Sequence, residues 1–570
     1  MKFRLSSWLT LGCITLLQAL SAPRFIFSAC ASLMEQNYHI SHVQLNNLIV
    51  ASETGRLFGF VSTAAATCFP AWMILFIGLV FGLVGYGVQC FCISHRIPAL
   101  SFWQALLLNI LAGNSSCWIN TYCQLLATRN FKDSYRTIVE ITSTYSGLSG
   151  KILTSLVEGI EGRKGSTNSS IYLLLTCLVP VAAGLIVALV HSCLEFMEYG
   201  DSDVFPAVFV LIIATGVYTV IESVAPFFGF VSLRLRAVIL ALVLTIPFKV
   251  ALLTAAADWF SAEKYHSQVT RTESNDSFES NPEKVSKEVK IAIGEEREVD
   301  QKAGGEVDSD DKGLFKAGND AGMKQLLLNV DFWMFYLVNA CGPTLGMVYL
   351  NNLERITQSR SMGEASFLLE ISSAFGFFGR MLSIMFHWYT RLEHFPLLET
   401  LKSWLHLVRC NNHVSFYGDI FLCWYYICIT REKSVIANPA LTVLLMIPMP
   451  IAVFLLLDSN RCLYISTGIL GTCSGALIAI NSMTTSELFG SENLAAKQTI
   501  VLTNIPLGSL LFGYLAAINL QSEGAGDHGV CIGLQCYHKT FIIWGSICFI
   551  GTILSFLLHL RTQNFYSQKS

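Results

Sequence analysis

Residues 331–352, DFWMFYLVNACGPTLGMVYLNN, decide the fold class. The segment is long and apolar enough to cross a bilayer, which takes roughly 20 mostly apolar residues. Its middle nevertheless carries Asn339, Pro343 and Thr344, which a simple anchor does not need. Intramembrane polar residues are costly and usually face a cavity or a partner helix. The segment is therefore predicted to be a helix of a polytopic protein, loosened by its proline beside an internal site.

Similar composition extends along most of the 570-residue chain, which is 53% hydrophobic and 14% charged, with a mean hydropathy of +0.53. Soluble domains carry about 25% charged residues, so an all-α polytopic membrane protein is predicted, with the lipid bilayer as its partner. The net charge of −3 offers no broad basic face, and nucleic acid is not an expected partner.

Hydropathy predicts about 14 spans, eight before a hydrophilic segment and six after it. The segment around residues 260–325 holds 15 acids and 10 bases, too polar to bury a core, and is predicted to be disordered. The predicted domains are an N-terminal six-helix bundle (1–196), an extra helix pair (204–258), a disordered cytosolic loop (259–325), a C-terminal six-helix bundle (326–561) and a tail (562–570).

The distribution of Lys and Arg favours a multi-pass protein with both termini cytosolic, in the plasma membrane or an endomembrane. Lys2, the hydrophilic loop and Arg561 then share the cytosolic side, although Arg163 and Arg236 fall outside. In this orientation Asn168, in an Asn-Ser-Ser sequence, is a candidate glycosylation acceptor.

Internal similarity predicts two related halves. QALSAPRFIF (18–27) resembles NACGPTLGMV (339–348), since each has an amide, an alanine and then a proline within an apolar helix. RNFKDSYRTIVEITSTYSGLSG (129–150) pairs in the same way with ELFGSENLAAKQTIVLTNIPLGSLLFG (487–513). Transporters often carry such repeats, with the substrate site between them.

Polar residues within the spans are the candidates for a substrate pathway; for any single one, helix–helix hydrogen bonding is the alternative. They are Gln18, Arg24, Asn114, Asn120, Asn339, Thr344, Asn481 and Asn504. Arg24 would attract an anion if it faces inward, or reach the interface if it faces lipid.

Closely spaced glycines predict tight or moving helix interfaces. The candidates are Gly55 and Gly59 in GRLFG, and Gly376 and Gly379 in FGFFGR. Arg380 ends the second motif, where it either fixes an inner gate or serves as a positive-inside anchor.

Most of the 18 cysteines lie in apolar runs, but Cys531 and Cys536 share a hydrophilic loop and form a candidate disulfide. The sequence has no ATP-binding GxxxxGK[ST] and no catalytic HExxH. An enzyme is therefore not predicted, and neither a metal nor a cofactor is expected.

Two stretches, SETGRLFGFVSTAAATCFPAWMILFIGLVFGLVGYGVQ and NSSCWINTYCQLLATRNFKDSYRTIVEITSTYSGLSG, resemble the plant nodulin-like proteins of the major facilitator superfamily. DFWMFYLVNACGPTLGMVYLNNLERITQS, SSAFGFFGR, and TSELFG followed by IPLGSLLFGYLA resemble the nuclear-fusion-defective type of that family. The resemblance implies a major facilitator fold, in which two six-helix bundles surround a central cavity.

Two departures from the family pattern stand out. The family usually has a small or hydroxylated residue at the position of Arg24, which puts an inherited substrate preference in doubt. Residues 391–430 are an anomalous insertion; we hypothesise a retained intron, which sequencing of the transcript across codons 385–435 would test.

The predicted function is secondary active transport of a small polar or anionic solute, with monocarboxylates suggested by the resemblance and protons as a candidate coupling ion. The alternative is a transport-inactive membrane scaffold or receptor-like protein in membrane fusion or organisation.

Overall fold

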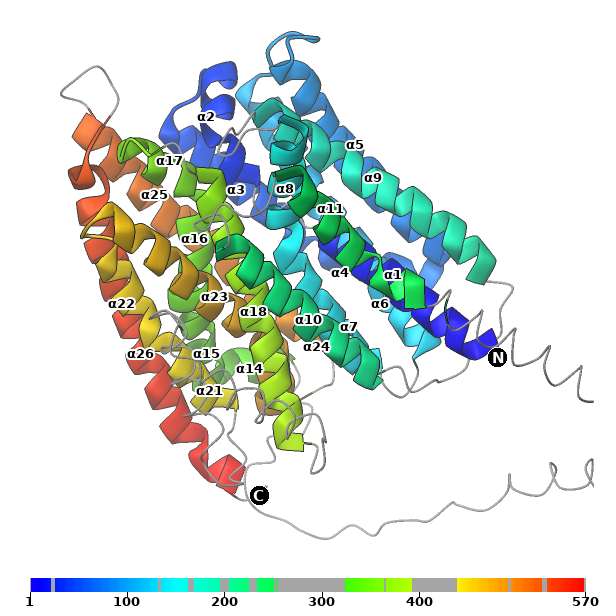
Figure 1. The fold of residues 1–570 in the computed structure, drawn as a ribbon. Coiled ribbons are helices and arrows are strands. Elements are labelled where there is room, and N and C mark those ends of the chain that lie inside the picture. Colours follow the sequence, from blue (N-terminus) through cyan, green and yellow to red (C-terminus); the bar gives the residue numbers. More distant parts are fainter. Residues whose placement is uncertain are drawn as a thin grey trace, which may run out of the picture.

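In a computed structural model, all regular secondary structure over the described residues is helical. The structure describes residues 2–21, 26–131, 135–161, 169–194, 205–224, 233–250, 253, 323–362, 365–391, 438–490, 494–524 and 531–567. Helices of the amino-terminal half lie on one side of the molecule and those of the carboxy-terminal half on the other (Figure 1). Both chain termini lie at the same end, here called the terminal end; the opposite end is the distal end (Figure 1).

The amino-terminal half contains α1 (Lys2–Leu20), α2 (Ile26–Tyr38), α3 (His42–Leu57), α4 (Gly59–Cys68), α5 (Ala71–Ile93), α6 (Phe102–Asn130), α7 (Tyr135–Ser143), the 3₁₀ turn η1 (Thr144–Leu148), α8 (Ser149–Glu161) and α9 (Ser169–Leu194). Helices α3 and α6 begin at capping boxes, in which Ser41 pairs with Gln44 and Ser101 with Gln104. Each box satisfies two backbone N–H groups that a helix start otherwise leaves without partners.

Helices α10 (Phe205–Val224) and α11 (Leu233–Leu244) follow as an extra pair between the halves. Helix α10 packs against the carboxy-terminal half through α18, whereas α11 packs against α8 of the amino-terminal half. The pair therefore bridges the boundary between the two halves (Figure 1).

The carboxy-terminal half contains α14 (Met323–Leu328), α15 (Val330–Asn339), the π-helical turn η3 (Ala340–Thr344), α16 (Leu345–Asn351), α17 (Leu353–Ser359), α18 (Ala365–Arg391), α21 (Asn438–Met446), α22 (Pro448–Leu455), α23 (Asn460–Phe489), α24 (Leu494–Leu502), α25 (Asn504–Gly524), the 3₁₀ turn η4 (Leu534–Tyr537) and α26 (His538–Ser567). Helix α26 extends to Ser567, so most of the segment 562–570, expected to be a tail, continues the last helix.

The segment 331–352 forms a helix that is distorted where the sequence predicted it. Pro343 lies within the π-helical turn η3. Proline has no N–H to donate to the preceding turn, and a wider turn accommodates the missing hydrogen bond. The prediction of a loosened helix beside Asn339 and Thr344 is thus confirmed, and both side chains are buried.

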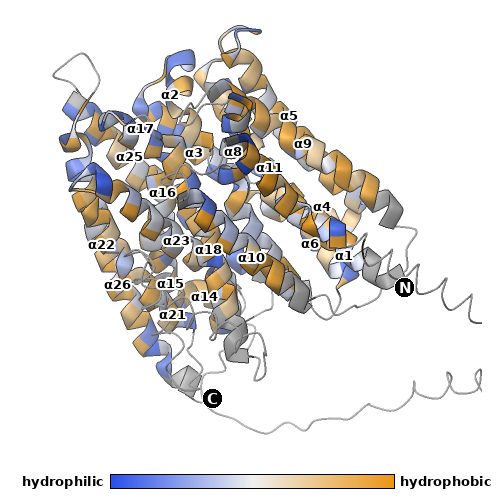
Figure 2. Cartoon of the chain, in the orientation of Figure 1, coloured by the Kyte–Doolittle hydropathy of each residue, from blue (hydrophilic) through white to orange (hydrophobic). Residues whose placement is uncertain are grey.

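Seven helical segments among the described residues are long and apolar enough to cross a membrane. The outer faces of α5, α9 and α26 are largely hydrophobic (Figure 2), and Trp103 and Leu189 are more than 70% exposed. In a bilayer such apolar surface contacts lipid while helices satisfy their own backbone groups. The expected total of about 14 spans stays a prediction.

Several sequence predictions concern residues outside the described ranges. Arg24, Asn168, most of the loop 259–325 and nearly all of the segment 391–430 belong to this group.

Candidate functional site

A polar cavity of ≈ 330 Å³ lies between the two halves. Small-molecule sites usually have volumes of about 300–1,000 Å³, so a small solute fits. Gln124 on α6, Ile384 on α18 and Gln498 on α24 line the cavity and lie near the helix ends that point to the terminal end (Figure 1). The cavity therefore extends toward the end that carries both termini.

Neutral amides are the largest group of polar side chains in the lining. The seven amide side chains on its wall are Gln18, Asn120, Gln124, Asn339, Asn481, Gln498 and Asn504. They come from α1 and α6 in the amino-terminal half, and from α15, α23, α24 and α25 in the carboxy-terminal half. An amide both donates and accepts hydrogen bonds, so the wall matches a polar solute that does the same.

Six of the eight pathway candidates line this cavity, namely Gln18, Asn120, Asn339, Thr344, Asn481 and Asn504. Two pairs among them are hydrogen-bonded. The Gln18 amide donates to Oδ1 of Asn120 at 2.8 Å, and the Thr344 hydroxyl donates to Oδ1 of Asn504 at 2.9 Å. Each half thus holds one pair in place beside the cavity.

The remaining two pathway candidates are Asn114 and Arg24. Asn114 does not line the cavity; its backbone lies against Gly55 where α3 and α6 cross, so it takes part in helix packing. The structure does not describe Arg24.

The cavity also holds charged groups. Glu53 and Arg56 on α3 form an ion pair through Nη1 of Arg56, which lies 2.8 and 2.7 Å from the two carboxylate oxygens. Sequence reasoning overlooked this pair, although a glutamate three residues before an arginine is a recognisable helical spacing. Glu140 on α7 and Arg380 on α18 complete the charged lining.

Arg380 contributes to the cavity wall. The sequence predicted either an inner-gate residue or a positive-inside anchor, and neither prediction placed Arg380 in this wall. Its Nη1 donates to the Ser146 hydroxyl of η1 at 2.7 Å. The guanidinium therefore connects α18 of one half to η1 of the other.

The predicted glycines mark close helix contacts of different tightness. A Cβ at Gly55 would lie 2.1 Å from the Ile110 carbonyl oxygen, whereas one at Gly59 would lie 3.3 Å from Sγ of Cys117. A Cβ at Gly379 would lie 2.1 Å from the Thr472 carbonyl oxygen, whereas one at Gly376 would lie 3.5 Å from the nearest atom. Gly55 and Gly379 thus permit an approach that no larger residue allows.

Polar contacts of α2 with the end of α16 and with α17, together called the distal gate, join the halves at the distal end. The Ser28 hydroxyl donates to the Leu350 carbonyl at 2.6 Å, and the Ser32 hydroxyl donates to Glu354 at 2.7 Å. Arg355 forms an ion pair with Glu35. Burial raises the pKa of the Glu354 carboxyl, although the hydrogen bonds from Ser32 oppose this shift. These contacts hold the two halves together at the distal end.

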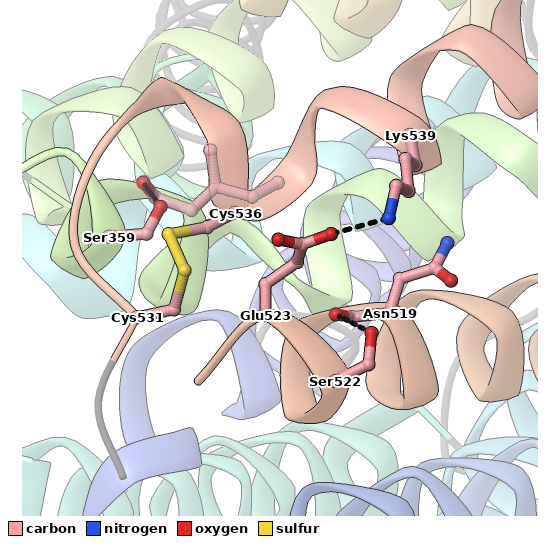
Figure 3. Close-up of a disulfide and its surroundings, with 8 residues drawn as sticks. Ser359, Asn519, Ser522, Glu523, Cys531, Cys536 and Lys539 are labelled. Atoms are coloured by element: carbon pink, nitrogen blue, oxygen red, sulfur yellow. Dashed lines mark hydrogen bonds and ion pairs between the residues drawn. A yellow bond between two sulfur atoms is a disulfide. The ribbon is translucent and has the colours of Figure 1, made fainter. Parts of the chain in front are cut away.

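A disulfide joins Cys531 to Cys536 at the distal end, with an S–S distance of 2.07 Å (Figure 3). Within the bridged loop, the Gly533 N–H donates to the Ser359 carbonyl at the end of α17 at 2.6 Å. Nearby, Lys539 pairs with Glu523 at 2.7 Å (Figure 3). The loop is thereby fastened to the distal gate.

Within the described part of the chain, no three His, Cys, Asp or Glu side chains gather as a group that could hold a metal ion. The cavity lining offers hydrogen bonding and charge.

Two helical halves around a shared polar cavity define the class as the major facilitator fold. Solved structures with this fold are similar over nearly their whole length. A D-xylose–proton symporter gives a TM-score of 0.52 at 9% identity, covering 97% of this chain and 96% of that chain. A bacterial homologue of the human lysosomal transporter Spinster, inward-facing and unoccupied, gives 0.50 at 13% identity, covering 97% of each chain.

Sequence comparison gives the family. The nodulin-like family model matches residues 7–252, and the model of the NFD4 C-terminal domain matches residues 315–394 and 402–568. Protein NUCLEAR FUSION DEFECTIVE 4 of Arabidopsis thaliana is 30% identical over 586 aligned residues, covering 99% of this chain and 90% of that protein. The chain belongs to this nodulin-like family, nuclear-fusion-defective type, as its motifs predicted.

Proposed function

We propose that the chain is a secondary active transporter that moves a small polar solute by alternating access. The observation that carries this proposal is the polar cavity, which both halves line. Alternating access places a solute site between two halves that rock about it. With the distal gate closed, the protein is in a conformation whose cavity faces the terminal end. We place that end in the cytosol, as the distribution of Lys and Arg favours.

The lining supports a hydrogen-bonding solute more directly than a simple anion. Arg56 and Arg380 face the cavity together with Glu53 and Glu140, so the two signs are equally represented. A monocarboxylate stays a candidate, since an arginine binds a carboxylate well. The seven amides favour a solute with several hydroxyl, amide or mixed polar groups.

The test is uptake by the purified full-length protein in proteoliposomes. Sugars, amino acids, short peptides and carboxylates are offered with and without a pH gradient. We expect saturable uptake of at least one class, and uptake by protein-free vesicles sets the background. If every class fails against that background, the transporter proposal is abandoned.

A pair of variants tests the site itself. Asn120→Ala removes the acceptor of the Gln18 amide and one polar group of the wall. Loss of one such group costs about 1–3 kcal/mol, so the affinity falls about fivefold or more. Ser546→Ala is the matched control, because Ser546 lies on an exposed face of α26 and donates to its own helix. Equal uptake by both variants contradicts the site.

A scaffold in membrane fusion is the second candidate, favoured by the name of the Arabidopsis relative. Its interaction element would be the charged segment within residues 259–325. If the protein is a scaffold, deletion of residues 270–315 abolishes its cellular role. If it is a transporter that needs no partner, the deletion leaves both solute uptake and the cellular role intact.

A further inference from the structure

A cluster of buried charges joins both halves to the extra helix pair, away from the cavity. Lys151 on α8, Glu222 on α10, Arg236 on α11 and Glu370 on α18 are all buried. None of the four lines the cavity. These residues, here called the charge cluster, connect four helices that are far apart in the sequence.

The contacts centre on the two glutamates. Both Lys151 and Arg236 form ion pairs with Glu222. Oε2 of Glu370 lies 3.3 Å from Nη2 of Arg236 and 3.8 Å from Nζ of Lys151. Its Oε1 accepts a 3.3 Å hydrogen bond from Ser155 on α8. Glu370 is therefore held by groups that lie outside its own half.

Two further titratable groups face the cluster. Glu158 on α8 interacts electrostatically with Arg236, and Tyr218 on α10 interacts with both Arg236 and Glu222. Carboxylates and cations thus meet at one buried point, where the charge balance is sensitive to any separation of the helices.

The packing of the extra pair ties this cluster to the movement of the halves. Gly216 of α10 lies against Met381 of α18, and Ala237 of α11 lies against Gly159 of α8. Helices α8 and α18 belong to different halves and pack against each other, so rocking of the halves to open the distal side would part them. Glu370 would then leave the cations, and a buried carboxylate without a partner is strongly disfavoured. Protonation removes that charge and its desolvation penalty.

We propose that Glu370 binds the coupling proton. In the conformation described here its carboxylate pairs with Lys151 and Arg236. As the distal gate opens, a proton from the distal side adds to a carboxylate oxygen and gives a neutral carboxyl. The proton leaves when Glu370 returns to the two cations. This inference rests on the proposed transport function and specifies its coupling site.

The experiment measures hydrogen–deuterium exchange of the full-length protein in lipid nanodiscs. Amides of α2 and α17 report opening of the distal gate, from about pH 5 to pH 8, after correction for the intrinsic pH dependence of exchange. We expect faster exchange at acidic pH in the unaltered protein. Glu370→Gln, which resembles the protonated form, should exchange rapidly at every pH and lose the transition.

Lys151→Met gives a second, directional test. Removing a cation that favours the Glu370 carboxylate raises its proton affinity, so the transition shifts upward by about 1 pH unit or more. Glu523→Gln is the matched control, because it breaks an ion pair with Lys539 within one half. That variant should retain the transition unchanged.

The contrary outcomes are equally definite. His42, which pairs with Glu35 of the gate, and Glu354 can also titrate there, so a transition that persists in Glu370→Gln belongs to such groups and overturns the proposal. Absence of a transition in the unaltered protein overturns it as well. If Glu370→Gln does not fold, an unshifted midpoint in Lys151→Met has the same consequence.

The readout requires no solute, which separates this inference from the transport proposal. A transition abolished by Glu370→Gln, together with a failed uptake screen, keeps the proton site and removes the transporter. Measurable uptake, together with a pH transition that Glu370→Gln leaves unchanged, keeps the transporter and removes the proton site.

Discussion

Gly379 of α18 lies directly beneath the backbone carbonyl of Thr472 on α23, so that a Cβ at Gly379 would come within 2.1 Å of that oxygen. Because a backbone oxygen cannot rotate away, Gly379→Ala must separate the two helices. Overpacking of this kind costs about 1–3 kcal/mol. We expect the apparent melting temperature of the purified protein, followed by tryptophan fluorescence, to fall by several degrees.

Gly376→Ala is the control for this prediction, one turn earlier on the same helix. Its Cβ would lie 3.5 Å from the nearest neighbour, the Gly471 carbonyl oxygen, which is an ordinary contact. The variant should melt within about a degree of the unaltered protein, since alanine also has the better helix propensity. If both variants melt alike, the close α18–α23 contact is wrong.

The second prediction concerns the ion pair between Arg355 on α17 and Glu35 on α2. Arg355→Gln removes a charged contact between the halves, and hydrogen bonds to charged groups contribute about 1.5–3 kcal/mol. The distal gate should therefore open at least about tenfold more often. The rate of hydrogen–deuterium exchange in α2 and α17 measures how often the gate opens. Lys539→Gln, which breaks an exposed ion pair within one half, should leave this exchange rate unchanged.

The sequence was sufficient to predict the class of fold, because hydropathy and repeated polar motifs reflect local constraints on each helix. Gln18 and Asn339 stood out as amides inside apolar helices, and both line the cavity. The distorted turn at Pro343 also followed from the chemistry of a single residue.

Contacts between distant helices could not be predicted in this way. Lys151 and Glu370 are 219 positions apart (370 − 151), and the structure brings them within 3.8 Å. The sequence placed Arg236 on the wrong side for the positive-inside rule, but gave no sign of its partner Glu222. Asn114 shows the converse problem, since its polarity indicates a cavity while its position places it in a helix crossing.

The third prediction concerns the disulfide between Cys531 and Cys536. It forms only where the distal end faces an oxidising compartment, so non-reducing peptide mapping of protein purified from cells also tests the orientation. Closing a short loop stabilises a protein by about 2 kcal/mol. A reductant should therefore lower the melting temperature of the unaltered protein by a few degrees. It should have no effect on the double variant Cys531→Ser and Cys536→Ser, and free thiols in the purified protein would reverse the proposed topology.

The last prediction concerns Lys497, which is buried although lysine almost always reaches water. Its Nζ donates to the carbonyls of Phe489 at 2.6 Å and Gly490 at 3.4 Å, where α23 ends. Gly490 has a φ of 82°, a conformation that favours glycine and leaves the last carbonyls pointing toward the ammonium. Lys497→Met keeps the side-chain length but leaves these buried acceptors without their donor, at about 1–3 kcal/mol. We expect a fall of several degrees in melting temperature, against no change in Lys539→Met, whose side chain is 68% exposed. A stable Lys497→Met protein would show that water replaces the ammonium at this helix end.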